Sequence, residues 1–213
     1  MRSRRGEMRR FVITVLVVGF VALGLQTNVC HAVLYPFEIF TSNGAYADGS
    51  AVNIYMDVYN GDGIAKFAFY NESSASCSIT RVFFDDGTLL GIDDIENGPG
   101  VLFEQVTTGP GDLPAGENLI PPFAADREFN IGAEPPPYWN GINSPDEWLI
   151  VTFELNGSLE DVLNELGNGI LRVGIHIQGF SDGSSESAVN VPEPATICLL
   201  GLGGLALLRK RKV

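Results

Sequence analysis

The end of this 213-residue chain combines three kinds of sequence that a globular domain does not place side by side. Val191-Pro192-Glu193-Pro194 is rigid and extended, because each proline fixes its own φ and keeps the preceding residue out of the helical region. An uncharged apolar run of 14 residues, 195–208, follows and covers roughly 21 Å as a helix, less than the ~30 Å hydrocarbon core of a bilayer. The run predicts a helix held transiently in a membrane. The tail is therefore not expected to belong to a globular core. A basic stop of the kind that stays on the cytoplasmic side closes it, formed by Arg209, Lys210, Arg211 and Lys212.

A Pro-Glu-Pro motif, a short apolar helix and a terminal basic cluster, in this order, resemble the PEP-CTERM sorting signal of exported Gram-negative proteins. The resemblance covers only about the last 23 residues. It implies that an exosortase recognises Pro192, Glu193 and Pro194 and that processing occurs at or near them. It also implies delivery to the cell surface, outer membrane or extracellular matrix through an inner-membrane intermediate. The alternative is an ordinary C-terminal anchor behind a proline-rich stalk.

The first 32 residues have the parts of a secretory signal peptide. Five arginines between Arg2 and Arg10 precede an apolar run, Phe11–Leu25. Small residues at positions −3 and −1 in Cys30-His31-Ala32 predict cleavage after Ala32 by the Sec and signal peptidase machinery. Acylation of Cys30, as in a lipoprotein, and an uncleaved N-terminal anchor are the alternatives.

The two targeting segments divide the chain into a signal peptide (1–32), an extracellular domain (33–186) and a sorting signal with its linker (187–213). The segment from Val33 to Val191 contains four Lys or Arg residues and 24 carboxylates, which gives a formal charge of −20. Nucleic-acid binding is excluded on this count, because phosphate contacts need clustered cations. The four cations are Lys66, Arg81, Arg127 and Arg172.

Hydrophobic periodicity predicts a mainly β domain. Apolar and polar residues alternate with the period of two that a half-buried strand shows. One helix is expected around residues 159–166, capped by Ser158 and ended by Gly167 in the left-handed conformation. We expect an antiparallel β-sandwich, jelly-roll or Ig-like, with this one short amphipathic helix and a hydrophobic targeting helix at each terminus. The strands are expected at 51–60, 64–70, 77–84, 88–92, 101–107, 148–155 and 169–179.

Eight of the twelve prolines lie between Gly109 and Asp146, which predicts a long surface excursion. Tyr138 and Trp139 make it a candidate ligand-contact surface, unless these rings cover an edge of the sandwich. A glycan-binding domain would expose a planar row of rings, whereas a passive structural domain would bury them. The two candidate rows are Tyr138, Trp139 and Trp148, or Tyr55, Tyr59 and Tyr70.

The domain lacks an evident catalytic set, so we expect no enzyme activity. His176 is its single histidine, on the polar face of a strand with Arg172 and Gln178, and no Gly-x-Ser-x-Gly motif is present. Carboxylate pairs are abundant, so a glycoside hydrolase activity remains the alternative. No cofactor is expected; Ca²⁺ is the one candidate, weighed against ordinary turn chemistry, with oxygen ligands from Asp57, Asp62, Asp85 and Asp86.

Two functional hypotheses follow. In the first, the chain is an exported surface or matrix protein with a non-catalytic structural or interaction role, linked to exopolysaccharide because the resemblance implies that association. In the second, the domain is a secreted carbohydrate-binding module or glycoside hydrolase that uses the same export route.

Overall fold

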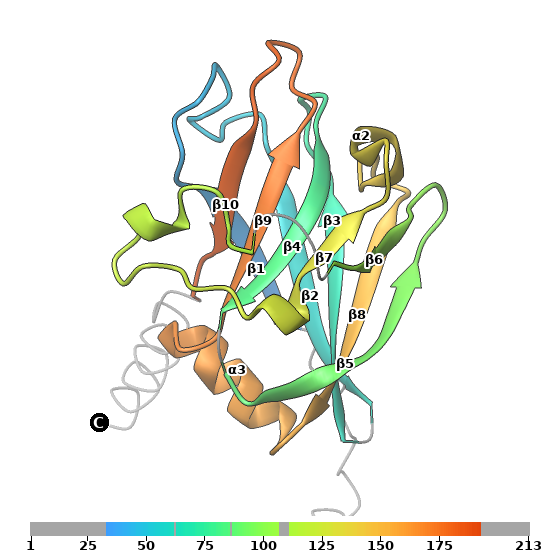
Figure 1. The fold of residues 1–213 in the computed structure, drawn as a ribbon, viewed down its shortest axis with the longest axis vertical. Coiled ribbons are helices and arrows are strands. Elements are labelled where there is room, and N and C mark those ends of the chain that lie inside the picture. The colour runs from blue at the N-terminus through green and yellow to red at the C-terminus, as the bar shows by residue number, and fades with distance from the viewer. Residues whose placement is uncertain (1–32, 62, 86, 107–110, 193–213) are drawn as a thin grey trace, which may run out of the picture. The chain divides into compact units, whose positions relative to one another are not determined.

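The computed structural model describes residues 33–61, 63–85, 87–106 and 111–192. Within them ten strands form one antiparallel sheet, accompanied by two α-helices and two short 3₁₀ turns (Figure 1). The mainly β, antiparallel prediction is therefore confirmed. Both predicted targeting helices lie outside the described residues, and no helix within those residues is long and apolar enough to cross a membrane.

The strand order across the sheet is β5-β8-β3-β2-β1-β10-β9-β4-β7-β6, and each neighbouring pair is antiparallel. The helices are α2 (Pro137–Asn140) and α3 (Leu159–Asn168), and the 3₁₀ turns are η1 (Gly116–Asn118) and η2 (Arg127–Phe129). The strands are β1 (Val33–Ile39), β2 (Ile54–Gly61), β3 (Ile64–Asn71), β4 (Ser78–Asp85), β5 (Leu89–Asn97), β6 (Phe103–Gln105), β7 (Ile131–Ala133), β8 (Trp148–Leu155), β9 (Arg172–Gln178) and β10 (Glu186–Asn190).

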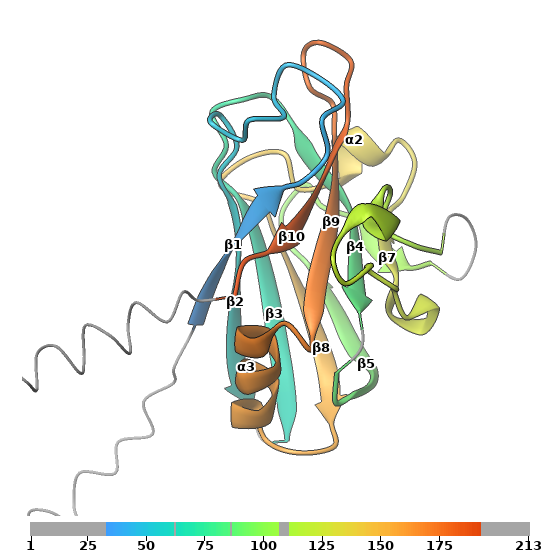
Figure 2. The same cartoon turned by 90° about the vertical axis from the view of Figure 1, so that its left-hand side faces the viewer.

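Strand β1 joins two halves of the sheet. Residues 33–36 pair with β2, whereas residues 37–39 pair with β10. Pro36 lies where the pairing passes from β2 to β10, a position at which the missing N–H of proline disturbs the fewest hydrogen bonds between strands. One half therefore contains β5, β8, β3 and β2, and the other contains β10, β9, β4, β7 and β6 (Figure 2).

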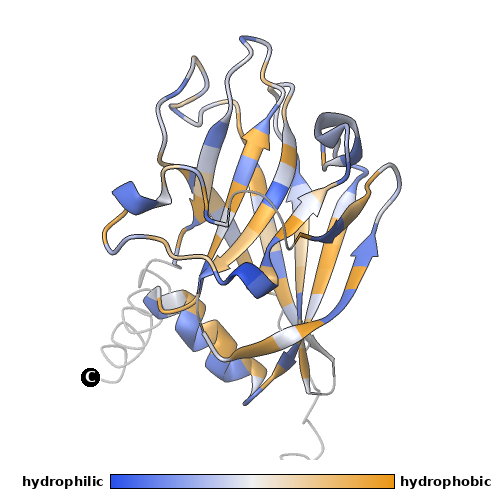
Figure 3. Ribbon diagram, viewed as in Figure 1, coloured by the Kyte–Doolittle hydropathy of each residue, from blue (hydrophilic) through white to orange (hydrophobic). Residues whose placement is uncertain are grey.

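The apolar faces of the two halves meet and form the core. The Phe84 ring on β4 lies 5.3 Å from the Phe67 ring on β3 and 4.7 Å from the Phe153 ring on β8, centroid to centroid. Apolar residues follow the strands that line this interior (Figure 3). At the far ends of the sheet, the Asn97 amide on β5 accepts from the Phe103 N–H and donates to the Phe103 carbonyl of β6. These bonds link the two end strands and make the sheet nearly a barrel.

The predicted helix is confirmed as α3, but its end differs from the expectation. Ser158 and Asp161 form a capping box, in which the Ser158 hydroxyl accepts from the Asp161 N–H and the Asp161 carboxylate accepts from the Ser158 N–H. Gly167 was the expected left-handed residue, but the helix continues through it and Gly169 ends it at φ 68°. Gly169 takes the capping role because its N–H donates to the carbonyls of Glu165 and Leu166, while Val162 and Leu166 pack on the core.

The folded domain also extends beyond its expected end. Residues 187–190, assigned from the sequence to a polar linker, complete β10, which pairs with both β9 and β1. Glu186 opens this strand and is fully buried, because its carboxylate accepts from the backbone N–H groups of Asn43 (3.0 Å) and Gly44 (2.9 Å). Polar residues can therefore occupy an interior strand here.

Candidate functional site

A hollow of about 340 Å³ opens on the outer face of β4 and β9. Its floor depends on a β-bulge: Ile79 pairs with Ile177 and Arg81 pairs with His176, so Thr80 is an extra residue in β4. A bulge re-aims side chains. Here Thr80 and Arg81, although consecutive, both line the hollow.

Four polar side chains converge on the floor, from Thr80, Arg81, His176 and Gln178. The Thr80 hydroxyl is occupied, donating to the His176 carbonyl at 3.2 Å. The His176 ring and the Gln178 amide make no side-chain hydrogen bond with any part of the chain that the structure describes. They remain able to bind an external polar group.

The walls of the hollow are apolar. They are formed by Phe83 of β4, by Pro114, and by Ala133, Pro135 and Pro137 at the end of β7 and the start of α2. Phe83 belongs, with Leu113 and Phe123, to a small cluster separate from the main core. Apolar walls around a few convergent polar groups are the usual composition of a small-molecule site, and this volume lies at the small end of their range.

Electrostatically, the hollow differs from the rest of the domain. Burial and then the nearby Arg81 guanidinium lower the pKa of His176, so its ring is neutral at pH 7 and Arg81 carries the charge. None of the described residues that line it is Asp or Glu. A second hollow, of about 410 Å³, has instead the carboxylates of Glu38 and Asp48 in its lining.

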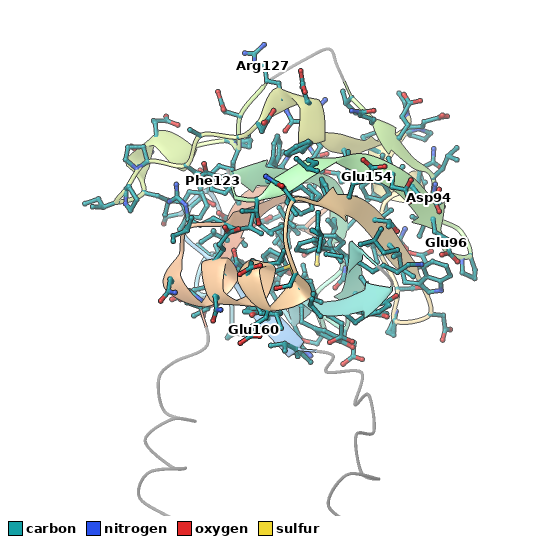
Figure 4. The ribbon with its side chains drawn as sticks, turned by 90° about the horizontal axis from the view of Figure 1, so that it is seen from below. Asp94, Glu96, Phe123, Arg127, Glu154 and Glu160 are labelled. Atoms are coloured by element: carbon teal, nitrogen blue, oxygen red, sulfur yellow. The ribbon has the colours of Figure 1, made fainter. Side chains whose placement is uncertain are left out.

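The acidic side chains gather on other surfaces. Asp94 and Glu96 on β5 lie beside the outer face of β8, whose Glu154 is also exposed, and Figure 4 shows the three labels on one side of the molecule. None of these three carboxylates lines the hollow, whose one charged side chain among the described residues is Arg81. Sequence analysis missed this site; the one available signal was the pairing of a rare arginine and the single histidine on outward strand positions.

The C-terminal end of the described chain leaves the sheet directly from β10. The Val191 N–H donates to the Pro36 carbonyl of β1 at 3.0 Å, and Pro192 is exposed. One residue therefore separates the last strand from the Pro-Glu-Pro sequence. The rest of the predicted sorting signal, Glu193, Pro194 and the basic stop of residues 209–212, lies outside the described residues, as does Ala32.

Comparison with family models identifies this end of the chain. Residues 190–212 match the model of the PEP-CTERM protein-sorting motif. The chain carries a PEP-CTERM sorting signal. The signal implies an exported protein that an exosortase processes at the membrane and that is displayed at the cell surface. No curated protein and no solved structure shows a significant match to the chain.

The predicted contact residues of this PEP-CTERM protein, Tyr138 and Trp139, lie in α2. Their rings pack edge to face at 4.9 Å. The Tyr138 hydroxyl lies 3.0 Å from the Ser76 hydroxyl, and its ring covers Gly179 so closely that a Cβ there would lie 2.1 Å away. Trp139 is 67 % exposed. Tyr138 thus closes the end of the domain, and Trp139 is the ring available to a partner.

The strand register places the second predicted set of rings in a different grouping from the one expected. Tyr55 pairs with Tyr70, and Tyr70 pairs with Trp148, so these three share one row on the outer face of β2, β3 and β8. Tyr59 lies farther along β2, opposite Lys66. The rings of Tyr55 and Tyr70 stack at 5.2 Å, near the spacing of adjacent strands, so each covers a face of the other. The two therefore do not form a planar row.

This stack predicts an alkaline loss of stability. Burial, followed by a hydrogen bond to the Glu72 carboxylate, raises the pKa of Tyr55 from 10.0 to about 12. The folded state thus favours the protonated phenol, and its stabilisation is present below pH 10 and lost as the pH rises toward about 12. Tyrosinate absorbance of the native protein should show this late titration and Tyr55→Phe should remove it; a Tyr55 titration centred near pH 10 would contradict the prediction.

The two candidate calcium ligands that the structure describes, Asp57 and Asp85, lie on different strands. Asp57 lies on β2, and burial raises the pKa of its carboxyl group. Asp85 lies at the end of β4 and is bound by the Arg172 guanidinium. Asp62 and Asp86 lie outside the described residues. Within the described ranges, no group of three or more His, Cys, Asp and Glu side chains could hold a metal ion.

Proposed function

We propose that this exported protein has a non-catalytic structural or interaction role at the cell surface or in the extracellular matrix, in contact with exopolysaccharide. The observation that carries the proposal is the direct junction of the folded domain with the PEP-CTERM motif. Val191 is hydrogen-bonded to β1, so the folded domain that the signal would deliver extends to the residue before the Pro-Glu-Pro sequence. The proposal includes a sandwich architecture, supported by the ring contacts between the two halves of the sheet.

The composition of the hollow favours binding over catalysis. General acid–base or nucleophilic chemistry needs a nucleophile with a base in hydrogen-bond reach, and that base is usually oriented by a third group. Here the His176 ring faces no Ser, Cys or carboxylate among the described lining residues, and the Thr80 hydroxyl is used on a backbone carbonyl. We therefore assign the site no reaction.

A carbohydrate-binding module is the second candidate function, and the hollow favours it specifically. Sugars present apolar ring faces and polar hydroxyl groups together. Proline and phenylalanine walls around amide, imidazole and guanidinium donors match both properties.

The sorting step is tested by intact mass and cell fractionation. We expect the native protein to lose its C-terminal tail and reach the surface or medium. Replacing Pro192, Glu193 and Pro194 together by alanine should leave the tail attached and the protein in the inner membrane, because the exosortase no longer recognises it. The matched control is alanine at Ser184 and Ser185, which are half-buried and lie between the turn at residues 181–183 and β10. If the native protein keeps its tail and stays in the inner membrane, the C-terminal segment acts only as an anchor, and the proposed display at the cell surface is overturned.

A further inference from the structure

We propose that the hollow over β4 and β9 binds the carboxylate-bearing sugar of an acidic polysaccharide, a uronic acid residue. The inference rests on the proposed contact with exopolysaccharide and names the class of sugar recognised. Its basis is the arrangement of Arg81, His176 and Gln178 in an apolar hollow.

The charge of the domain favours an anionic ligand at this hollow over other surfaces. The domain has four Lys or Arg residues and 24 carboxylates, so its surface repels a polyanion over most of its extent. Arg172 is bound to Asp85 and to two backbone carbonyls. The hollow combines a guanidinium and an imidazole with no described carboxylate in its lining. An anionic group can approach the domain favourably at this place.

The pairing of Arg81 with His176 also favours an anion. The two side chains stand directly opposite on neighbouring strands, where two basic groups are unfavourable. The cost is limited here because burial and the Arg81 charge keep His176 neutral. An anion bound between them would interact favourably with both. A guanidinium has five N–H donors, so a carboxylate can be held by two of them while others serve contacts within the protein.

The shape and lining of the hollow suit a sugar that carries a carboxylate. The carboxylate of a uronic acid is attached directly to a sugar ring, so a site for it needs cationic donors beside an apolar surface. Phe83, Pro114 and Pro135 supply that surface around the polar floor. Gln178 can both donate to and accept from the sugar hydroxyls, because its amide is unpaired within the described chain. A volume of about 340 Å³ suits a short portion of a chain.

The test is calorimetric titration of the full chain, purified in mild detergent, with an oligomer of galacturonic acid. The same oligomer with its carboxylates methyl-esterified is the comparison ligand, since it keeps the sugar rings and hydroxyl groups, removes the charge and adds one methyl group per carboxylate. We expect the acid to bind about tenfold or more tightly than the ester, the scale of a charge-assisted hydrogen-bond pair. Arg81→Gln should abolish this preference, and Gln178→Ala should weaken the binding of both ligands.

The control variant is Lys66→Gln, which removes one positive charge from β3 in the other half of the sheet. It should retain the preference for the acid, because long-range charge alone does not create it. Histidine NMR supplies a second readout that does not depend on the stability of the Arg81 variant. The bound carboxylate should shift the His176 ring resonances and raise the pKa of that ring, leaving His31 unchanged.

Equal affinity for acid and ester, or an unshifted His176 resonance at saturation, would overturn the inference. A preference that Lys66→Gln removes as fully as Arg81→Gln would also overturn it. Binding of the ester as tightly as the acid would still support contact with polysaccharide. Export and surface display are tested separately, by mass and fractionation, so failure of the ligand and failure of the proposed function give different results.

Discussion

Replacing Phe84 by alanine should lower the free energy of unfolding by about 3–5 kcal/mol, among the largest effects expected of one core residue. The Phe84 side chain is fully buried on β4 and lies between the two halves of the sheet. Its ring makes edge contacts with the rings of Phe67, Phe69 and Phe153. Removing it leaves a cavity that two rigid faces cannot close, and it also removes the aromatic contacts that join them.

Urea unfolding followed by tryptophan fluorescence would measure this change. Leu90→Ala is the matched control, because Leu90 lies on β5 with 57 % of its surface exposed and should change stability by less than about 0.5 kcal/mol. A loss below about 1 kcal/mol for Phe84→Ala would show that the halves of the sheet do not pack through this ring.

Replacing Asp85 by alanine should cost about 3 kcal/mol, because it leaves the Arg172 charge largely buried without its partner. The two side chains are only 10 % and 15 % exposed. The same guanidinium donates to the carbonyls of Pro121 (2.7 Å) and Pro122 (2.6 Å) and lies over the Phe123 ring. Arg172 therefore fastens one wall segment of the hollow to β9, and Asp85 holds Arg172 in place.

A double-mutant cycle separates the pair from its surroundings. Arg172→Met keeps the apolar stem without the charge, so Asp85→Ala combined with Arg172→Met should be less destabilised than the sum of the single variants. Additive losses would show that the ion pair contributes no coupling. Proteolysis within residues 111–126 should also increase in Arg172→Met if this residue holds the segment.

Several elements were predicted from sequence because packing agrees with the local pattern. In β8 and β9, inward Val, Leu, Ile and Phe alternate with outward residues, and all of these inward side chains except Leu155 are buried, although Thr152 and Gly174 at outward positions are buried too. Helix α3 carried both an apolar stripe and a capping residue. Strand β5 was expected to end at Ile92 but continues to Asn97, because two bulges interrupt the period of two that identifies a strand.

Other elements depend on contacts between distant residues. Strand β1 was missed because Pro36 interrupts it and its two ends pair with different neighbours. Residues 187–190 of strand β10 were assigned to a linker, although Ser187 and Asn190 are buried in the sheet. The hollow was beyond local reasoning too, since its floor needs the β4–β9 register and its walls come from segments about 20 residues apart.

The position of β10 has a mechanical consequence. The strand has neighbours on both sides, and the chain passes from its end to the sorting motif through a single bonded residue, Val191. A pull on this tether acts along the strand, across hydrogen bonds that lie perpendicular to it. The bonds to β1 and β9 are then loaded together in shear instead of being peeled apart singly. Tension applied at this end of the domain would therefore be shared among these hydrogen bonds.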